Sequence, residues 1–425
     1  MAPGMAPPLA LAAPAPAAAL TERILLMVLY ITVLASSIAF IEPSPHDGLM
    51  CVLLVTAFVA GISFDRILAV PFALLLVWNI GGLLSLMNVP AEEKAIQYAA
   101  TSIYLAIAAL LFACLFGRNT MTRLATMRAA YVLTATVISF AGIAGYFSLF
   151  PHAHDLFATF DRALGAFKDP NVFGPYLIWP ALIVIERMLT RRIGALDLTI
   201  VGILLLGLLL SFSRGAWFHF GVSCAITVAL TMFSAPTLRD RFRIFAITAF
   251  SVATAAALVV VLLSFQSIGG MFEQRAHLIQ YYDVGSGGRF RLQEQALSVV
   301  LNMFNGMGPF EFARVYGLQQ HNVYLQAFIV YGWIGGMAYI LLLASTLWIA
   351  LRTVLVRTPW QPYLITAFGA FVGEVLEGFV IDTDHWRHFY LLLGMVWGLA
   401  AATLRQMQQS PAVAPHSGMS YVGAA

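Results

Sequence analysis

The sequence predicts an all-α polytopic membrane protein with about twelve transmembrane helices. The first observation is composition: 60% of the 425 residues are hydrophobic and only 10% are charged, whereas soluble domains carry about 25% charged residues. A chain this apolar cannot cover itself with polar surface in water, so lipid must solvate much of it. The other two observations are a series of long apolar runs and an uneven distribution of arginines among the loops.

The apolar runs are the candidate transmembrane helices. A helix needs about 20 apolar residues to cross ~30 Å of hydrocarbon. The second run is short, and only the turn Ser213-Arg214-Gly215 separates the seventh from the eighth. The twelve runs are 24–41, 48–63, 67–87, 95–116, 129–150, 171–187, 196–212, 215–234, 244–266, 322–351, 361–381 and 386–404.

The two ends of the chain differ from this pattern. The first twenty residues are rich in Ala and Pro and contain no Lys or Arg, so they lack the basic start of a signal peptide. We expect disordered tails at 1–22 and 406–425 on either side of a transmembrane domain at 23–405. The net charge of +3 gives no indication of nucleic-acid binding, and the three cysteines are too isolated for a disulfide framework or a zinc site.

The basic residues predict the orientation of the helices. With the N-terminus inside, the inside loops hold fourteen arginines and only five acids, as the positive-inside rule requires. These are Arg23, Arg66, Arg118, Arg123, Arg128, Arg187, Arg191, Arg192, Arg239, Arg241, Arg243, Arg352, Arg357 and Arg405, with Glu22, Asp65, Glu186, Asp197 and Asp240. Nine basic residues then lie outside, against the bias, and need another reason to be there: Lys94, Arg162, Lys168, Arg214, Arg275, Arg289, Arg291, Arg314 and Arg387. The long outer loop 266–321 is the stretch that could form a small extramembrane subdomain, and its first half has the mixed composition of a surface-lying amphipathic helix.

Two arginine-containing segments are candidate anion sites. Arg214 lies in a short turn between two apolar runs, where an arginine is costly unless it is paired or snorkels to the interface. Its guanidinium group could instead bind phosphate in bidentate fashion. Arg289 and Arg291 follow the glycine-rich stretch 285–288, whose freed backbone N–H groups could cradle an anion. The alternative for this segment is a flexible loop with a solvated charge pair.

His321 is the candidate general base. It lies where the outer loop meets the tenth run, and the ordinary pKa of histidine, near 6.5, suits a base at an aqueous rim. Asn322 beside it could fix the ring or bond a sugar, and Tyr324 offers a stacking surface. The alternative is that His321 only caps the helix or donates a hydrogen bond.

Two further outer segments carry polar side chains. At Lys168-Asp169-Pro170-Asn171, Pro170 breaks any preceding helix and Asn171 can cap the following one, while Lys168 adds an outer cation. The stretch from Asp382 to His388 crowds acids, histidines and Arg387 into one turn. It could bind a divalent metal through Asp382 and Asp384, or form a salt-bridge or substrate-binding cluster. Glu374 and Glu377, inside the eleventh run, need a polar interior and could reach one of the arginines.

Together these segments resemble the O-antigen ligase and O-antigen polymerase superfamily over roughly residues 90 to 400. The resemblance rests on the Ser-Arg-Gly turn after the seventh run and on the long outer loop with its arginine. It also rests on Gly306-Met307-Gly308-Pro309 followed by His321-Asn322-Val323-Tyr324-Leu325, on Gly332-Trp333-Ile334-Gly335-Gly336, and on Asp169-Pro170-Asn171.

The resemblance implies a class C glycosyltransferase fold in the bacterial inner membrane, with its active site and the loop 266–321 facing the periplasm. Members move a glycan from undecaprenyl diphosphate to lipid A core, to a growing glycan chain or to a protein Ser or Thr. No cofactor or metal is implied. The resemblance assigns Arg214 and Arg289 to the donor diphosphate and His321 to the acceptor, so these three are the predicted catalytic residues. The predicted substrate-binding residues are Lys168, Asp169, Asn171, Arg291, Asn322, Tyr324 and Arg387.

Elementary chemistry agrees with that assignment. A diphosphate leaving group needs stabilisation of its developing charge, which fixed cations can supply, and the acceptor hydroxyl needs a base on the aqueous side. No carboxylate pair at a clear spacing suggests a glycosyl-enzyme intermediate, so a single inverting displacement is expected. Ligase activity toward lipid A core is the first prediction and polymerase activity the alternative. A transporter or flippase of an anionic lipid-linked substrate is a second alternative.

Overall fold

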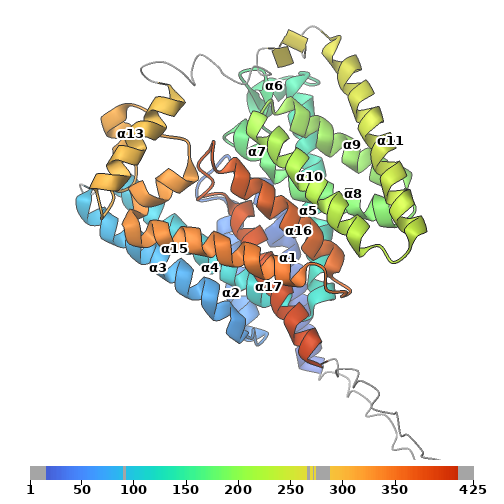
Figure 1. Ribbon diagram of the computed structural model, residues 1–425, viewed down its shortest axis with the longest axis horizontal. Helices are drawn as coiled ribbons and strands as arrows, with labels where there is room; N and C mark the ends of the chain where they lie inside the picture. Colours follow the sequence, from blue (N-terminus) through green and yellow to red (C-terminus); the bar gives the residue numbers. More distant parts are fainter. Residues whose placement is uncertain (1–15, 90–91, 266–268, 271, 274–287, 410–425) are drawn as a thin grey trace, which may run out of the picture.

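The computed structural model describes residues 16–89, 92–265, 269–270, 272–273 and 288–409. Its described part is almost entirely helical, with one two-stranded antiparallel hairpin that pairs Ala158 with Ala163 and Thr159 with Arg162. Figure 1 shows a bundle in which α3 and α15 lie side by side, α17 runs through the middle and α11 stands at one edge. The predicted fold class, an all-α polytopic membrane protein, is confirmed.

The first half of the chain forms α1 to α8 and the hairpin. The elements are α1 Pro16–Leu34, η1 Ala35–Ser37, α2 Pro45–Val59, η2 Arg66–Leu68, α3 Ala69–Ser85, η3 Leu86–Asn88, α4 Glu93–Gly117, α5 Thr120–Tyr146, α6 Ala153–Phe157, β1 Ala158–Thr159, β2 Arg162–Ala163, α7 Pro170–Tyr176 and α8 Ile178–Thr190. The second half begins at α9. Its elements are α9 Ala195–Leu210, α10 Arg214–Ser234, α11 Leu238–Leu263, α13 Arg289–Asn302, α14 Glu311–Tyr316, α15 Val323–Thr353, α16 Gln361–Glu377 and α17 Arg387–Gln409.

Each of the twelve predicted apolar runs is a helix in the structure, the sixth as α7 followed by α8. Within the described residues, nine helices are long and apolar enough to cross a membrane. The helices α2, α9 and α16 are shorter, at 15, 16 and 17 residues. The molecule is therefore a multi-pass membrane protein whose helices differ in how far they reach across the bilayer.

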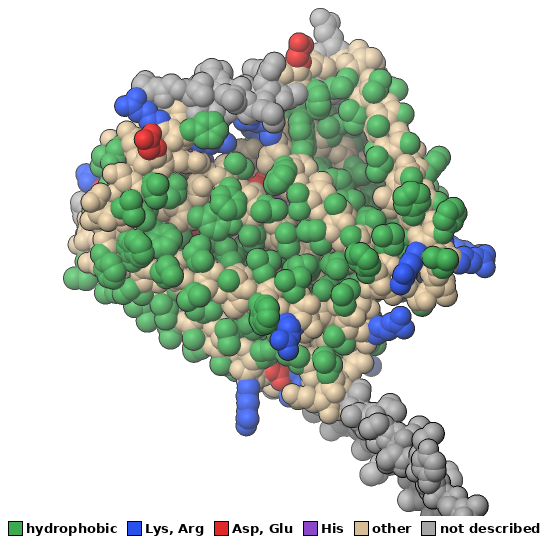
Figure 2. Space-filling view, viewed as in Figure 1, with side chains coloured by type: hydrophobic (Ala, Val, Ile, Leu, Met, Phe, Trp, Pro, Cys, Tyr) green, Lys and Arg blue, Asp and Glu red, His purple; other side chains and the backbone are tan. Residues whose placement is uncertain are grey.

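The outer surface of the bundle is apolar. Figure 2 shows a broad field of hydrophobic side chains over the middle of one face, with Lys and Arg side chains near its edges. Large hydrophobic side chains such as Phe58, Phe140 and Trp348 are more than half exposed, which would be unfavourable in water but suits contact with lipid. Helix α11 is the extreme case, because Ile244 is its one buried residue.

The interior is closely packed where glycines replace larger residues. A Cβ atom added at Gly394 of α17 would lie 2.4 Å from the Ala109 carbonyl oxygen of α4. One added at Gly373 of α16 would lie 2.2 Å from the Ser223 hydroxyl oxygen of α10. Since apolar burial does not drive helices together in lipid, small residues that allow close approach supply much of the attraction. These contacts place α16 and α17 at the centre of the bundle.

The loop predicted at 266–321 is partly described. Its residues 289–302 form α13, which packs against α15 through Leu292, Ala296 and Val300. These positions are spaced four residues apart, as expected of an amphipathic helix. The glycines at 285–287 lie outside the described residues.

The predicted disordered tails, 1–22 and 406–425, are partly helical where they adjoin the transmembrane domain. Helix α1 begins at Pro16 and α17 continues to Gln409, so helix reaches into both predicted tails. Interactions at these ends account for the extension, because Arg123 donates to both carboxylate oxygens of Glu22 and Arg405 bonds to Asp65 and to the Gly117 carbonyl. The rest of both predicted tails, 1–15 and 410–425, lies outside the described residues.

The ion pairs separate into two groups that match the predicted sides of the membrane. Residues predicted inside pair with one another, as do residues of the outer segments. The inner pairs are Arg123–Glu22, Arg187–Asp197 and Arg405–Asp65, and the outer pairs are Lys168–Glu42, Arg314–Glu311 and Arg387–Asp47. The grouping agrees with the even number of predicted spans and places both ends of the described chain on one side.

A phosphatase reporter, active only outside the cytoplasm, tests this orientation. Fused after Gly288, before α13, it should be active; fused after Arg241, in the first turn of α11, it should be inactive. The arginines of the inner loops resist export, which gives the expected sign. The reverse pattern of activities would show that the assignment of sides is wrong.

Candidate active site

His321 is held at the outer end of α15 by the residues around it. Its backbone is left-handed, with φ of 50°, and the next residue, Asn322, caps the helix. The Asn322 amide oxygen accepts from the backbone N–H groups of Tyr324 and Leu325 at 3.0 and 3.2 Å, while its amide nitrogen donates to the Phe379 carbonyl at 3.1 Å. The His321 side chain remains 44% exposed, so it is accessible from outside the protein.

Asp382 is the acid beside His321. One of its carboxylate oxygens lies 3.7 Å from Nδ1 of His321, and the other is buried without a hydrogen-bond partner in the described structure. Burial, reinforced by the charge of Asp384, raises the pKa of Asp382 to about 7, against the opposing effects of the Asn322 backbone and Arg289. Near neutral pH the group therefore exists in both protonation states.

Charges around His321 favour its neutral form. Burial lowers the pKa of His321, the nearby positive charge of Arg289 lowers it further, and the negative charge of Asp169 partly opposes them. A neutral imidazole can accept a proton, as a general base must. His321, Asp382, Arg289 and Asp169 thus form one electrostatic group, although they come from four separate segments of the chain.

Of the two arginines at the start of α13, only Arg289 belongs to this group. Arg289 is the first residue of α13 and is half-buried, whereas Arg291 is exposed. Helix neighbours two positions apart do not share a face. The structure therefore brings Arg289 close to His321 and Asp382 and directs Arg291 elsewhere.

The Arg214 turn is fixed by bonds from a residue that sequence analysis did not single out. The Ser213 side chain accepts from the backbone N–H of Ala216 at 3.4 Å, which caps α10. Arg162 of β2 is buried and donates to the Ser211 carbonyl at 2.7 Å and to the Asn171 amide oxygen at 2.8 Å. The sequence marked Arg162 only as one of the nine outer cations. Its hydrogen-bond partners, Ser211 and Asn171, are known only from the fold.

The start of α7 differs in detail from the expectation. Asn171 was expected to cap this helix, but Asp169 is the capping residue and accepts from the Asn171 backbone N–H at 2.8 Å. Pro170 occupies the first helical position, whereas a cap at Asn171 would have left it outside the helix. The Asn171 side chain is instead bonded to Arg162, so its observed role is to join the two outer segments.

A comparison with protein families supplies the last observation. The family model described as O-antigen ligase matches residues 199–340. This match supports membership of the O-antigen ligase superfamily. No curated protein matches it. The matched region runs from α9 into α15 and contains six of the predicted site residues: Arg214, Arg289, Arg291, His321, Asn322 and Tyr324.

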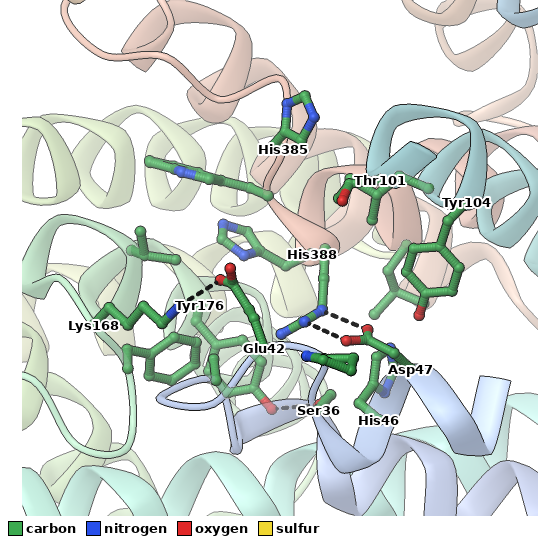
Figure 3. A pocket seen from close by; sticks show the side chains of 18 of the residues that line it. Ser36, Glu42, His46, Asp47, Thr101, Tyr104, Lys168, Tyr176, His385 and His388 are labelled. Atoms are coloured by element: carbon green, nitrogen blue, oxygen red, sulfur yellow. Dashed lines mark hydrogen bonds and ion pairs between the residues drawn. The ribbon is translucent and has the colours of Figure 1, made fainter. Parts of the chain in front are cut away.

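Three of the four remaining predicted residues line a cavity beside that group. The cavity has a volume of about 900 Å³ and is lined by Lys168, Asp169 and Arg387, among other residues. Figure 3 shows Lys168 directed toward Glu42, at 3.0 Å. Arg387 makes a two-pronged bond to Asp47, at 3.1 and 2.9 Å. Asp169 lines the cavity and also acts on His321, so it joins the two parts of the site.

Tyr324 is engaged with α16 rather than free for stacking on both faces. Its hydroxyl donates to the Val375 carbonyl, and its ring packs against Phe379 with centroids 4.4 Å apart. These contacts, like those of Asn322, attach the start of α15 to the end of α16. Any contact of Tyr324 with substrate would use the remaining part of its surface.

Asp382 and Asp384, the possible metal ligands, interact with different side chains. Asp384 accepts from the hydroxyl of Tyr98 and from Nδ1 of His385 at 3.1 Å, while Asp382 lies against His321. In the part of the chain that the structure describes, no group of three or more His, Cys, Asp or Glu side chains is arranged to hold a metal ion.

Replacement of Arg162 tests how the Arg214 turn is held. Arg162→Met keeps most of the side-chain volume but leaves the buried Ser211 carbonyl and the Asn171 amide oxygen without this donor, a loss of about 1–3 kcal/mol. In thermal unfolding in detergent, Arg162→Met should have a lower Tm than the wild type. Arg162→Lys keeps one donor group, so its Tm should fall between those of Arg162→Met and the wild type. An unchanged Tm in Arg162→Met would show that these bonds contribute little.

Proposed function

We propose that this protein is an inverting, O-antigen ligase-type glycosyltransferase that moves a glycan from undecaprenyl diphosphate to lipid A core. In this proposal the enzyme lies in the bacterial inner membrane and acts at the periplasmic face without a divalent metal. The observation that carries the proposal is the group formed by His321, Asp382 and Arg289, of which His321 and Arg289 fall inside the O-antigen ligase match. The group combines a half-exposed base with a cation at the outer end of the bundle.

The chemistry is a single displacement at the anomeric carbon. The acceptor hydroxyl oxygen forms the new bond to that carbon, while its proton passes to the neutral ring of His321. The bond from the anomeric carbon to the phosphate oxygen breaks, and its electron pair leaves with the diphosphate. Because one displacement occurs, the configuration inverts.

Two kinds of charge assist this step. Arg214 and Arg289 stabilise the negative charge that develops on the leaving diphosphate, since guanidinium groups make two parallel bonds to phosphate oxygens. Asp382, once ionised, stabilises the imidazolium that forms on His321. Fixed cations thereby take the place that a divalent metal would fill in another enzyme.

The cavity is proposed to receive the acceptor. Lys94, Lys168 and Arg387 give it three cations for the anionic groups of a lipid A core, and Tyr98 and Trp386 give it rings for sugar faces. Lys168 and Arg387 are paired with Glu42 and Asp47, so acceptor binding would exchange these partners. Asp169, Asn171 and Asn322 support substrate binding by holding the backbone, and Tyr324 by presenting its remaining surface. Arg291, which is exposed, is proposed to contact the donor glycan away from the diphosphate.

The alternative acceptor is a growing glycan chain, which would make the enzyme a polymerase with the same site. The surface glycans of a deletion strain distinguish the two. Loss of a ligase should leave long glycan on its lipid carrier. Loss of a polymerase should leave lipid core that bears a single repeat, and this result would contradict the lipid A core assignment.

Replacement of His321 separates binding from transfer. General base catalysis typically contributes ~10²–10⁴-fold, so His321→Ala should lower transfer by about that factor and leave binding of the lipid donor nearly unchanged. His152→Ala, which alters an exposed outer histidine, is the matched control and should transfer normally. A folded His321→Ala protein that transfers glycan at the wild-type rate would exclude the catalytic role.

The pH dependence of transfer tests the partnership with Asp382. His321 must be neutral to accept a proton, and its pKa lies below 6.5, so this requirement limits the rate only at acid pH. Ionisation of Asp382, with pKa about 7, should add a second rise as pH increases through 7. Asp382→Asn should lack this second rise and keep the first. Identical profiles in the two proteins would show that Asp382 does not assist His321.

A further inference from the structure

Two glutamates lie fully buried inside the helical bundle, and the proposed mechanism uses neither. Glu374 and Glu377 are one turn apart on α16, and both are 0% exposed. Glu377 is 2.8 Å from Nδ1 of His219 on α10, and Glu374 is 3.3 Å from Nε2 of His388 on α17. Their partners are thus histidines, where the sequence had suggested arginines. Ionisable residues in a membrane interior are rare and costly, so their presence indicates a role.

The His219–Glu377 pair shares a single proton. Nε2 of His219 lies 2.9 Å from the Ala370 carbonyl, and because a carbonyl oxygen can only accept, Nε2 carries a hydrogen. A proton between Nδ1 and the Glu377 carboxyl then completes the pair, either as neutral acid and neutral imidazole or as an ion pair. Both forms have zero net charge, which makes the pair tolerable in a low-dielectric interior.

The second oxygen of Glu377 faces the Arg214 turn. This oxygen, Oε1, has no hydrogen-bond partner in the described structure, and a Cβ atom added at Gly215 would lie 2.7 Å from it. The opposite side of the turn is equally close-packed, because a Cβ atom at Gly174 would lie 2.7 Å from that of Ala216. The turn is therefore confined between α7 and Glu377.

The residues that follow Glu377 hold the start of α15. The Gly378 carbonyl accepts from the Val323 backbone N–H at 2.9 Å, and the Phe379 carbonyl accepts from the Asn322 side chain at 3.1 Å. Three consecutive residues thus contact the turn that carries Arg214 and the helix start that follows His321. The C-terminal end of α16 determines the distance between these two segments.

We infer that Glu377, held by His219, is a positioning residue that fixes the Arg214 turn relative to His321. The inference rests on the proposed function, in which Arg214 binds the donor diphosphate. Glu377 itself touches no substrate in this account. A shift of the turn by about 1 Å would misplace the guanidinium group, and displacements of that size can cost ~10²-fold in rate.

Steady-state kinetics of purified variants, with lipid-linked glycan as donor, test the inference. Glu377→Ala should raise the donor KM roughly ten- to a hundredfold and leave the acceptor KM unchanged. Glu377→Gln should stay near wild type, because its amide can donate to His219 and present its oxygen to Gly215. Glu374→Ala is the matched control: it is equally buried on the same helix and does not touch the turn, so it should lower Tm but keep the donor KM.

Gly215→Ala alters the contact between Gly215 and Glu377 on the Gly215 side. It therefore tests the inference even if Glu377→Ala fails to fold. The added methyl group meets Glu377, so the donor KM should rise. In the double variant Gly215→Ala/Glu377→Ala the two effects should not add, because the clash is gone.

Three results would overturn the inference. Equal donor KM values in Glu377→Ala and Glu374→Ala would show a merely structural role. A loss in Glu377→Gln as large as in Glu377→Ala would assign the role to the proton or charge instead of to position. Additive effects in the double variant would show that the two residues act independently. Failure of the proposed function is recognised separately, since Arg214→Ala would then leave the donor KM unchanged whatever the Glu377 variants do.

Discussion

The bonds between the start of α15 and the end of α16 are the contacts on which the outer site depends. Asn322 caps α15 and donates to the Phe379 carbonyl, and the adjacent Val323 N–H donates to the Gly378 carbonyl. In hydrocarbon every backbone group must be satisfied within the protein, so helix ends and turns are confined to the rims or to buried polar contacts. The irregular segments that carry His321, Asp382 and Arg214 are therefore gathered at one end of the bundle, where Asn322 caps α15 and Ser213 caps α10.

This arrangement also explains how outer cations are accommodated. Lys168 and Arg387 are paired with Glu42 and Asp47 around the cavity, and Arg162 is buried among backbone and amide oxygens. The Lys168–Glu42 pair is exposed, and exposed pairs contribute little to stability, typically 0–1 kcal/mol; in the proposed function it exchanges for substrate at small cost. The buried bonds of Arg162 have the opposite character and maintain the Arg214 turn.

Local patterns in the sequence were sufficient for the fold class and for much of the local structure. Apolar length predicted the helices of the twelve runs but not α6 or α14, Pro170 marked the start of α7, and the Ser213 turn followed from two adjacent apolar runs. The pairings between distant segments could not be predicted in this way. His321 with Asp382 and His219 with Glu377 depend on how α10, α15 and α16 pack, and the choice of Asp169 over Asn171 as cap depends on the bond between Asn171 and Arg162. Hydrophobic periodicity predicts which face of a helix is buried, but it does not predict which polar side chains of distant segments meet.

The central claim is that the group around His321 holds the donor diphosphate, and Arg289 and Arg291 form a matched pair for testing it. They lie two residues apart on α13, but Arg289 is near His321 and Asp382, while Arg291 is exposed. Loss of a charge-assisted contact costs ~1.5–3 kcal/mol, so Arg289→Ala should weaken donor use roughly ten- to a hundredfold, and Arg291→Ala much less. The measurement is donor kcat/KM for the two purified variants at equal expression and Tm. Equal values for Arg289→Ala and the wild type, or a larger loss in Arg291→Ala, would contradict the account.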